Sequence, residues 1–205
     1  MKVNMLLGDT QMILDTCVKH KLLRNQAAYV LATAYWETGR TMKPVVEAYW
    51  LSEAWRRKNL RYYPYHGRGY VQLTWKRNYI KAGKELGVDF VKKPQKLLEP
   101  RNSAEILVVG SRDGWFTGKK LSDYITLSKS DFVGARRIIN GTDKRHAIAS
   151  IAKKYDAVLK ARGYGVTSAK TSQVPKVIQD PVSPPAAKSG LLETILRVLN
   201  NLLKG

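Results

Sequence analysis

Apolar residues recur every three or four positions in several parts of this chain, which is the spacing that places them on one face of an α-helix. The pattern predicts five helices, over residues 9–22, 25–39, 76–86, 103–110 and 146–159. Asp9 and Asn25 are suited to cap the first two helices, because short polar side chains accept hydrogen bonds from the first free backbone amides. Gly39 and Gly87 suit the left-handed position that commonly ends a helix.

A short alternation of apolar and polar residues occupies 70–74. Val71 and Leu73 would lie on one face of a strand, with Gln72 and Thr74 on the other. Helices predominate and one small β element is added, so we expect a mainly α domain of the α+β kind.

The pattern changes after residue 163. Residues 164–188 are rich in Pro, Ser and Thr without periodicity, which predicts a flexible linker. Residues 189–205 carry an apolar stripe opposite polar and cationic residues, which predicts an amphipathic helix. The chain is thus expected to consist of a domain over 1–163, a linker and a terminal helix. That helix would dock onto its own domain, associate with a second copy, or enter an anionic membrane or lipopolysaccharide surface.

The chain is strongly basic. Its 205 residues include 36 Lys and Arg against 16 Asp and Glu, which gives a net charge of +20. Residues 164–205 hold +3 of this charge, so the domain over 1–163 carries +17. Such a surplus attracts nucleic acid, anionic lipid or acidic bacterial surface polymers without choosing among them. The hydrophobic content of 44% excludes a wholly disordered or fibrous protein.

Few residues are suited to metal or redox chemistry. Cys17 is the single cysteine, which excludes an intramolecular disulfide, and its helical spacing places it in the core. His20, His66 and His146 lack the spacing of metal ligands, so we expect no metal site and no cofactor. No apolar run approaches the roughly 18–20 residues that span a bilayer, and no signal-peptide core is found. We therefore expect a protein made in the cytoplasm without an export signal of its own.

Two glutamates are candidates for acid–base chemistry. Glu37 lies seven residues after Val30 and three after Ala34, so helical geometry places it on the apolar face. A carboxylate there is partly desolvated, which favours its neutral form and suits a general acid. The alternative is a structural glutamate that pairs with an arginine or reaches out to water. Glu47 follows in a turn or extended segment, where the nearby Lys43 favours its ionised form.

Two carboxylates in such different environments are what a glycosidase needs, because one donates a proton to the leaving oxygen while the other acts on water or on the sugar. The aromatic residues point the same way. Eleven of the nineteen aromatics lie within residues 35–79, which predicts a groove whose walls stack on sugar rings or on unpaired bases.

Four motifs follow one another along the chain. They are Glu37-Thr38-Gly39, then Pro44-Val45-Val46-Glu47, then Gly67-Arg68-Gly69-Tyr70-Val71-Gln72-Leu73-Thr74 with Asn78-Tyr79, and finally Arg137-Ile138-Ile139-Asn140-Gly141. In order and spacing they resemble the family 19 glycoside hydrolases, and most closely the phage-type endolysins of that family. The resemblance covers about residues 8–163. It implies a lysozyme-like, mainly helical fold of two lobes with a cleft between them.

The resemblance also implies roles for particular residues. Glu37 would be the general acid and Glu47 the general base of a single displacement with inversion, and Thr74 would help to hold the attacking water. The substrate-contacting positions would be Arg68, Tyr70, Gln72, Asn78 and Asn140. The chain departs from chitin-cleaving relatives at Trp36, where a histidine is common, and at Ala149, where an arginine is common, which argues against the chitinase form of the active-site ion network.

The sequence thus predicts an endolysin that hydrolyses β-1,4 bonds between the amino sugars of peptidoglycan, most simply the bond after N-acetylmuramic acid. It would act as a monomer, have no nucleic-acid partner, and be made in the host cytoplasm before reaching the wall through a lesion made by another protein. Peptidoglycan carries acidic lactyl and peptide groups, which suit a +17 domain better than neutral chitin does. The alternatives are a chitinase, a lytic transglycosylase, and a cationic membrane-disrupting or wall-binding protein without enzymatic activity.

Overall fold

The computed structural model describes residues 3–165. The predicted helix over 189–205 and nearly all of the predicted linker over 164–188 lie outside the described residues, so both stay predictions. Within 3–165 every helix is too short or too polar to cross a membrane.

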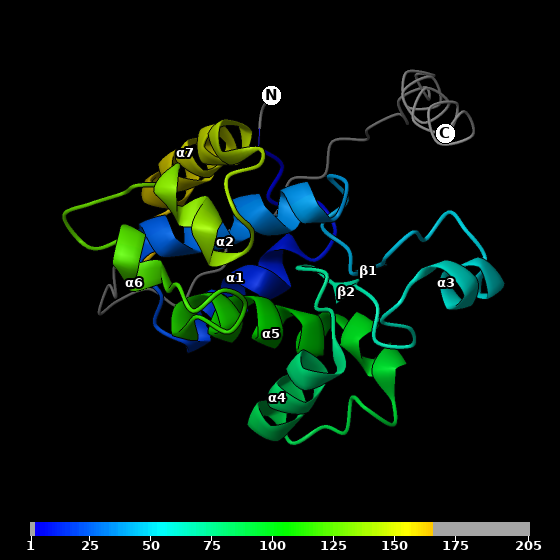
Figure 1. Cartoon of the computed structure of the whole chain (residues 1–205). Helices are drawn as coiled ribbons and strands as arrows, with labels where there is room; N and C mark the ends of the chain where they lie inside the picture. Colours follow the sequence, from blue (N-terminus) through cyan, green and yellow to red (C-terminus); the bar gives the residue numbers. More distant parts are fainter. Residues whose placement is uncertain (1–2, 166–205) are drawn as a thin grey trace, which may run out of the picture. The chain divides into compact units, whose positions relative to one another are not determined.

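The described residues form a mainly helical domain, which confirms the expected fold class (Figure 1). Its α-helices are α1 (Thr10–Lys19), α2 (Arg24–Glu37), α3 (Glu53–Asn59), α4 (Lys76–Leu86), α5 (Pro100–Asp113), α6 (Leu121–Tyr124) and α7 (Arg145–Ala161). The 3₁₀ helices are η1 (Pro94–Leu98) and η2 (Gly134–Ile138), and the strands are β1 (Val45–Val46) and β2 (Arg68–Gly69).

Helix α2 forms the centre of the domain. Figure 1 shows α7 on one side of it and α1 and α5 on the other, and α2 contacts all three helices. Its residues from Ala27 to Ala34 are all buried, so α2 has no solvent-exposed face over two turns. Four of those residues are alanines, whose small side chains let neighbouring helices approach closely.

The β element is an antiparallel pair that holds the chain after α2 against the segment before α4. Val45 pairs with Gly69 and Val46 with Arg68. The predicted strand over 70–74 is wrong, because this segment turns instead of extending. Gln72 has a φ of +54°, which breaks an extended chain, although Val71 and Leu73 are buried as their alternation suggested.

Helix boundaries agree best where the end signal is local. The structure places α4 at Lys76–Leu86 with Gly87 in the left-handed conformation, as predicted. Helices α5 and α7 extend a few residues beyond the predicted 103–110 and 146–159.

The first two helices differ from the prediction at their starts and ends. Helix α1 ends at Lys19 instead of reaching residue 22, and Val18, expected on the apolar face, is 57% exposed. The Asp9 side chain does not cap α1, because it accepts a hydrogen bond from the Tyr70 hydroxyl at 2.7 Å. Asn25 lies inside α2, and its amide donates to the Thr126 carbonyl, so a long-range contact takes the place of the expected cap.

Gly8 provides a test of the packing that precedes α1. It has a φ of +46°, and an added Cβ would collide with the backbone carbonyls of Thr41 and Met42. Gly39 has a φ of +60° with open space around its Cβ position. We expect Gly39→Ala to lower the free energy of unfolding by about 1 kcal/mol through backbone strain alone. Gly8→Ala should cost roughly 3 kcal/mol, because the collision adds to the strain.

Urea denaturation of the two variants measures the difference. Because both glycines have a left-handed backbone, equal losses would show that the contact between Gly8 and residues 41–42 contributes nothing.

Candidate active site

Glu37 is the last residue of α2, and its side chain points away from the helix core toward η2. Its Oε1 atom accepts a hydrogen bond from Nη1 of Arg136 at 2.5 Å. The side chain of Arg136 is 4% exposed and that of Glu37 is 20% exposed. A guanidinium so deeply buried needs a compensating charge, which Glu37 supplies. This is the arginine-paired glutamate that the sequence left as an alternative, although Oε2 of Glu37 keeps no protein partner among residues 3–165.

Arg136 also fixes the segment that contains the Asn-Gly motif. Its Nε donates to the Asp143 carbonyl at 2.9 Å, and its own carbonyl accepts from the Asn140 amide at 3.0 Å. Asn140 is exposed and lies within one turn of the partner of Glu37. Glu37, Arg136 and Asn140 thus form a first group of predicted and newly identified site residues.

Glu47 lies immediately after β1, where two donors hold its carboxylate. The Tyr62 hydroxyl donates to Oε1 at 2.6 Å, and the Gly67 amide donates to Oε2 at 2.8 Å. Burial, together with the hydrogen bond to Glu47, raises the pKa of Tyr62 to about 12, so its phenol remains a donor at neutral pH. The backbone amide of Glu47 donates in turn to the Gly67 carbonyl at 2.8 Å, so both its main chain and its side chain are anchored to residue 67.

A chain of contacts joins Glu47 to three other predicted residues. Gly67 lies between Glu47 and Gln72 and close to both. A Cβ at position 67 would lie 2.7 Å from Oε1 of Gln72 and 3.2 Å from Oε2 of Glu47. The Thr74 hydroxyl donates to the Gln72 carbonyl at 2.8 Å, and the amide of Asn78 donates to the Thr74 carbonyl at 2.7 Å. These residues form a second group around Glu47.

Gln72 itself holds the β element together. Its Nε2 donates to the carbonyls of Val45 at 2.9 Å and of Gly69 at 3.2 Å. These bonds stabilise the left-handed backbone at position 72 and tie the turn to both strands. The amide donors of Gln72 are therefore already engaged within the protein.

Arg68 and Tyr70 lie in the core, which corrects their prediction as substrate-contacting residues. Tyr70 is 0% exposed and its hydroxyl is bound to Asp9. The Arg68 guanidinium is buried, and it donates to the Pro64 carbonyl at 2.8 Å and to the Tyr79 hydroxyl at 2.6 Å. Their polar atoms are satisfied internally, so their motif stabilises the fold beside the site.

A short loop connects the two groups. Residues 38–44 run from the end of α2 to β1, and no hydrogen bond or ion pair within residues 3–165 joins Glu37, Arg136 or Asn140 to the group around Glu47. The loop is itself firmly held. The Thr38 hydroxyl donates to the Ala34 carbonyl at 2.7 Å and accepts from the Met42 amide at 3.0 Å, and the Met42 side chain is fully buried.

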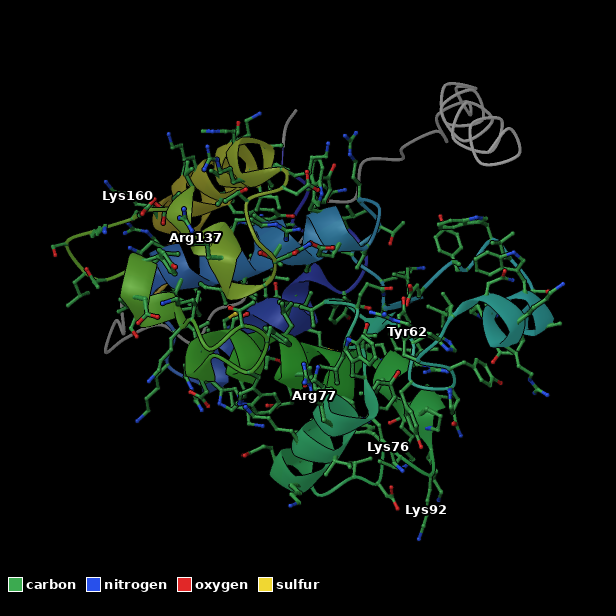
Figure 2. All side chains as sticks on the ribbon, in the orientation of Figure 1. Tyr62, Lys76, Arg77, Lys92, Arg137 and Lys160 are labelled. Carbon is green, nitrogen blue, oxygen red and sulfur yellow. The ribbon has the colours of Figure 1, made fainter. Side chains whose placement is uncertain are left out.

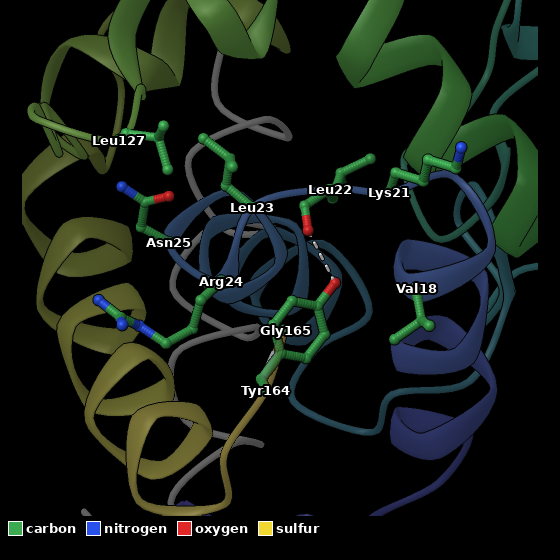
Figure 3. Close-up of a pocket in the computed structure, with 9 residues that line it drawn as sticks. All are labelled: Val18, Lys21, Leu22, Leu23, Arg24, Asn25, Leu127, Tyr164 and Gly165. Atoms are coloured by element: carbon green, nitrogen blue, oxygen red, sulfur yellow. Dashed lines mark hydrogen bonds between the residues drawn. The ribbon is translucent and has the colours of Figure 1, made fainter. Parts of the chain in front are cut away.

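The pocket drawn in Figure 3 contains none of the predicted site residues. It has a volume of about 660 Å³ and is lined mainly by the connection between α1 and α2, the start of α2, Leu127 and the end of the described chain. Across one side the Tyr164 hydroxyl donates to the Leu22 carbonyl at 3.1 Å. In the part of the chain that the structure describes, no group of three or more His, Cys, Asp or Glu residues is arranged to hold a metal.

Chitinases are among the known proteins that this chain resembles in sequence or fold. No protein-family model matches the chain. Over 78 residues it is 37% identical to an acidic endochitinase of Dioscorea japonica, an alignment that covers 38% of this chain and 29% of that relative. The chain thus matches less than a third of the length of this relative.

The domain resembles the crystal structure of chitinase C from Streptomyces griseus HUT6037, with a TM-score of 0.51 and 20% identity over 67% of this chain and 60% of that one. A mutant of chitinase C gives a TM-score of 0.50 and 18% identity over 75% of this chain and 83% of that one. The chain shares its fold with chitinase C. This likeness agrees with the mainly helical fold that the four motifs predicted.

Sequence reasoning missed three residues of the candidate site. Arg136 immediately precedes the last motif, but only the structure pairs it with Glu37, 99 positions away. Tyr62 belongs to the aromatic-rich segment without any signal that its hydroxyl binds Glu47. Gly67 is the first residue of a motif, and its closeness to Glu47 and Gln72 explains why a side chain does not fit there.

Arg136 and its neighbour Arg137, which Figure 2 labels, form a matched pair for a test, because Arg136 is buried and Arg137 is exposed. We expect Arg136→Gln to lower the free energy of unfolding by roughly 3 kcal/mol, since it leaves the Glu37 carboxylate without its partner. Arg137→Gln should change it by less than about 0.5 kcal/mol. Chemical denaturation measures both. Similar losses in the two variants would contradict a structural role for the Arg136–Glu37 pair.

Proposed function

We propose that this chain is a glycoside hydrolase that cleaves β-1,4 bonds between the amino sugars of peptidoglycan. The observation that carries the proposal is the pair of anchored glutamates, Glu37 at the end of α2 and Glu47 after β1, in a domain that shares its fold with chitinase C. Each carboxylate has a fixed orientation and different partners, which suits two different roles in one reaction.

Glu47 is suited to act as the general base. Its two oxygens each accept one hydrogen bond from the protein, and a carboxylate oxygen can accept a second from water. The Thr74 hydroxyl donates its hydrogen bond to the Gln72 carbonyl, so its oxygen is free to accept a hydrogen bond from the same water. A water that donates to Glu47 and Thr74 would present its lone pair to the anomeric carbon.

Glu37 is suited to act as the general acid. Because Oε1 is paired with Arg136, Glu37 must first take up a proton on Oε2, the oxygen that would then pass it to the glycosidic oxygen. In the single displacement, that proton passes to the leaving oxygen while Glu47 takes a proton from the attacking water. The new C–O bond forms on the opposite face of the sugar, so the product has inverted anomeric configuration.

The charge of the domain favours peptidoglycan over chitin as the substrate. Residues 1–163 carry +17, and the lactyl and peptide carboxylates of peptidoglycan would be attracted to such a surface, whereas chitin is neutral. Chitin is the second candidate, because the relative from Dioscorea japonica is named as an acidic endochitinase. As an endolysin, the protein would be made in a bacterial host and reach the wall after another protein opens the membrane, with residues 189–205 available to contact that membrane.

The central test is the replacement of each glutamate by its isosteric amide. We expect Glu37→Gln and Glu47→Gln each to slow cleavage of purified peptidoglycan by about a hundredfold or more, because each removes one proton-transfer group. Glu85→Gln is the control, since Glu85 is exposed on α4 and distant in sequence from both motifs. Mass spectrometry of the released fragments after borohydride reduction identifies the bond that is cut.

The fragments distinguish the alternatives. Reduced muramic acid ends that disappear in both variants would support the proposal, and reduced glucosamine ends would place the cut at the neighbouring bond. Anhydro ends with an active Glu47→Gln variant would indicate a lytic transglycosylase, and cleavage of chitin alone would indicate a chitinase. If neither glycan released fragments, the proposed hydrolase activity would be wrong, and a cationic binding or membrane-disrupting protein would be favoured.

Tyr62→Phe tests whether the orientation of Glu47 matters. The substitution removes only the hydroxyl that donates to Oε1 of Glu47. We expect kcat to fall roughly tenfold, with KM and melting temperature nearly unchanged. A misoriented base stabilises the transition state less well but does not change the binding of the substrate. Tyr49→Phe is the control, because Tyr49 is an exposed residue of the loop between β1 and α3. An unchanged kcat in Tyr62→Phe would show that this hydrogen bond does not support catalysis.

A further inference from the structure

Three exposed cations in the segment from α3 to the first residue of α4 each lie over an aromatic ring. The contacts are Arg57 over Tyr63 at 5.5 Å, Arg61 over Trp75 at 5.3 Å and Lys76 over Tyr65 at 5.9 Å, measured to the ring centroids. These distances are within the range of cation–π attraction. We refer to these six residues as the cation–aromatic cluster.

The cluster adjoins the candidate active site. Tyr62, whose hydroxyl binds Glu47, also contacts the Trp75 ring at 5.0 Å between centroids. The backbone amide of Trp75 donates to the Tyr65 carbonyl at 2.8 Å, which brings the second and third cation sites together. One side chain therefore separates the cluster from the carboxylate that we propose as the base. Figure 2 labels Tyr62 and Lys76 on this side of the domain.

Within the part of the chain that the structure describes, the three cations have no acidic partner. Within residues 3–165 no carboxylate lies within ion-pair distance of Arg57, Arg61 or Lys76. Glu53, the acidic residue of α3, is bound instead to Arg56 at 2.8 Å. The positive charge of the cluster is therefore left to attract an external anion.

Helix α3 supports a surface role for this region. None of its residues from Glu53 to Asn59 is buried, so the helix adds nothing to the hydrophobic core. Arg56 holds it in place by donating to the carbonyls of Ala48 and Leu51 at 2.9 and 2.8 Å. The chain thus builds an ordered, basic helix beside the site without using it for packing, and the aromatic rings restrict the cations before any ligand arrives, which lowers the entropy cost of binding.

We infer that the cation–aromatic cluster binds the carboxylates of an acidic glycan strand and thereby makes the enzyme prefer peptidoglycan over neutral chitin. This inference rests on the proposed glycosidase function. Aromatic faces suit sugar rings, and guanidinium groups bind carboxylates through paired hydrogen bonds. A neutral glycan would gain only the stacking, whereas a strand that bears lactyl and peptide carboxylates would gain both contacts.

The test is the triple variant Arg57→Gln, Arg61→Gln and Lys76→Gln, made in the Glu37→Gln background so that substrate is not consumed. Lys153→Gln, Lys154→Gln and Lys160→Gln, at exposed positions of α7, form a control triple that removes the same charge, and Figure 2 shows Lys160 well apart from Lys76 of the cluster. Binding is measured by co-sedimentation with purified peptidoglycan, with the same peptidoglycan after its carboxyl groups are amidated, and with chitin. All six exchanged cations are exposed, and melting temperatures equal to that of the Glu37→Gln parent verify folding.

We expect the cluster triple to bind native peptidoglycan roughly tenfold more weakly than its parent, with the control triple close to the parent. On amidated peptidoglycan and on chitin the three proteins should bind alike. Equally weakened binding by the control triple would show that net charge alone determines the affinity, and would overturn the inference. A tenfold loss that persists on amidated peptidoglycan would also overturn it, because carboxylates would not be the ligand.

Digestion by the unmodified protein keeps the two proposals apart. If it releases fragments from peptidoglycan while the cluster triple binds like its parent, the glycosidase stands and the inference fails. If it releases no fragments while the cluster triple alone loses binding to native peptidoglycan, the carboxylate-binding surface stands and the glycosidase fails.

Discussion

Helix α2 packs against α1, α5 and α7, and within residues 3–165 two of its long-range polar contacts lie at its two ends. At the start, Asn25 binds the loop that follows α6, and at the end Glu37 binds the buried guanidinium of Arg136. Both bonds reach more than ninety positions along the chain. A charge as buried as that of Arg136 is costly without a partner, so the end of α2 and the segment 134–143 hold each other in place.

The second glutamate depends on a different kind of support. Two strands of two residues each are too short to be stable alone, and the surrounding hydrogen bonds compensate for this. Gln72 binds both strands, Gly67 allows close packing, and Tyr62 holds the carboxylate from the other side. The rigidity that orients Glu47 therefore comes from polar contacts, whereas the position of Glu37 comes from hydrophobic burial of its helix.

The distribution of charge connects the site to its surroundings. Several basic residues are neutralised within the domain, such as Arg136 by Glu37 and Arg24 by Asp156. Within residues 3–165 no carboxylate pairs with Arg57, Arg61 or Lys76, and each of these three cations contacts an aromatic ring. Net charge alone does not distinguish these two kinds of basic residue, because exposure and partners decide which charges act on a ligand.

The sequence by itself determined the mainly helical class, the exact extent of α4 with Gly87 at its end, and the four motifs that contain both glutamates. These features depend on local spacing, which a helix expresses whatever surrounds it. Only the tertiary structure decided that Glu37 is paired, that Arg68 and Tyr70 are buried, and that residues 70–74 turn instead of forming a strand. Each of these outcomes depends on partners far away in the chain, such as Arg136 for Glu37 and Val45 for Gln72, and side-chain periodicity carries no information about a contact that forms only when distant segments pack together.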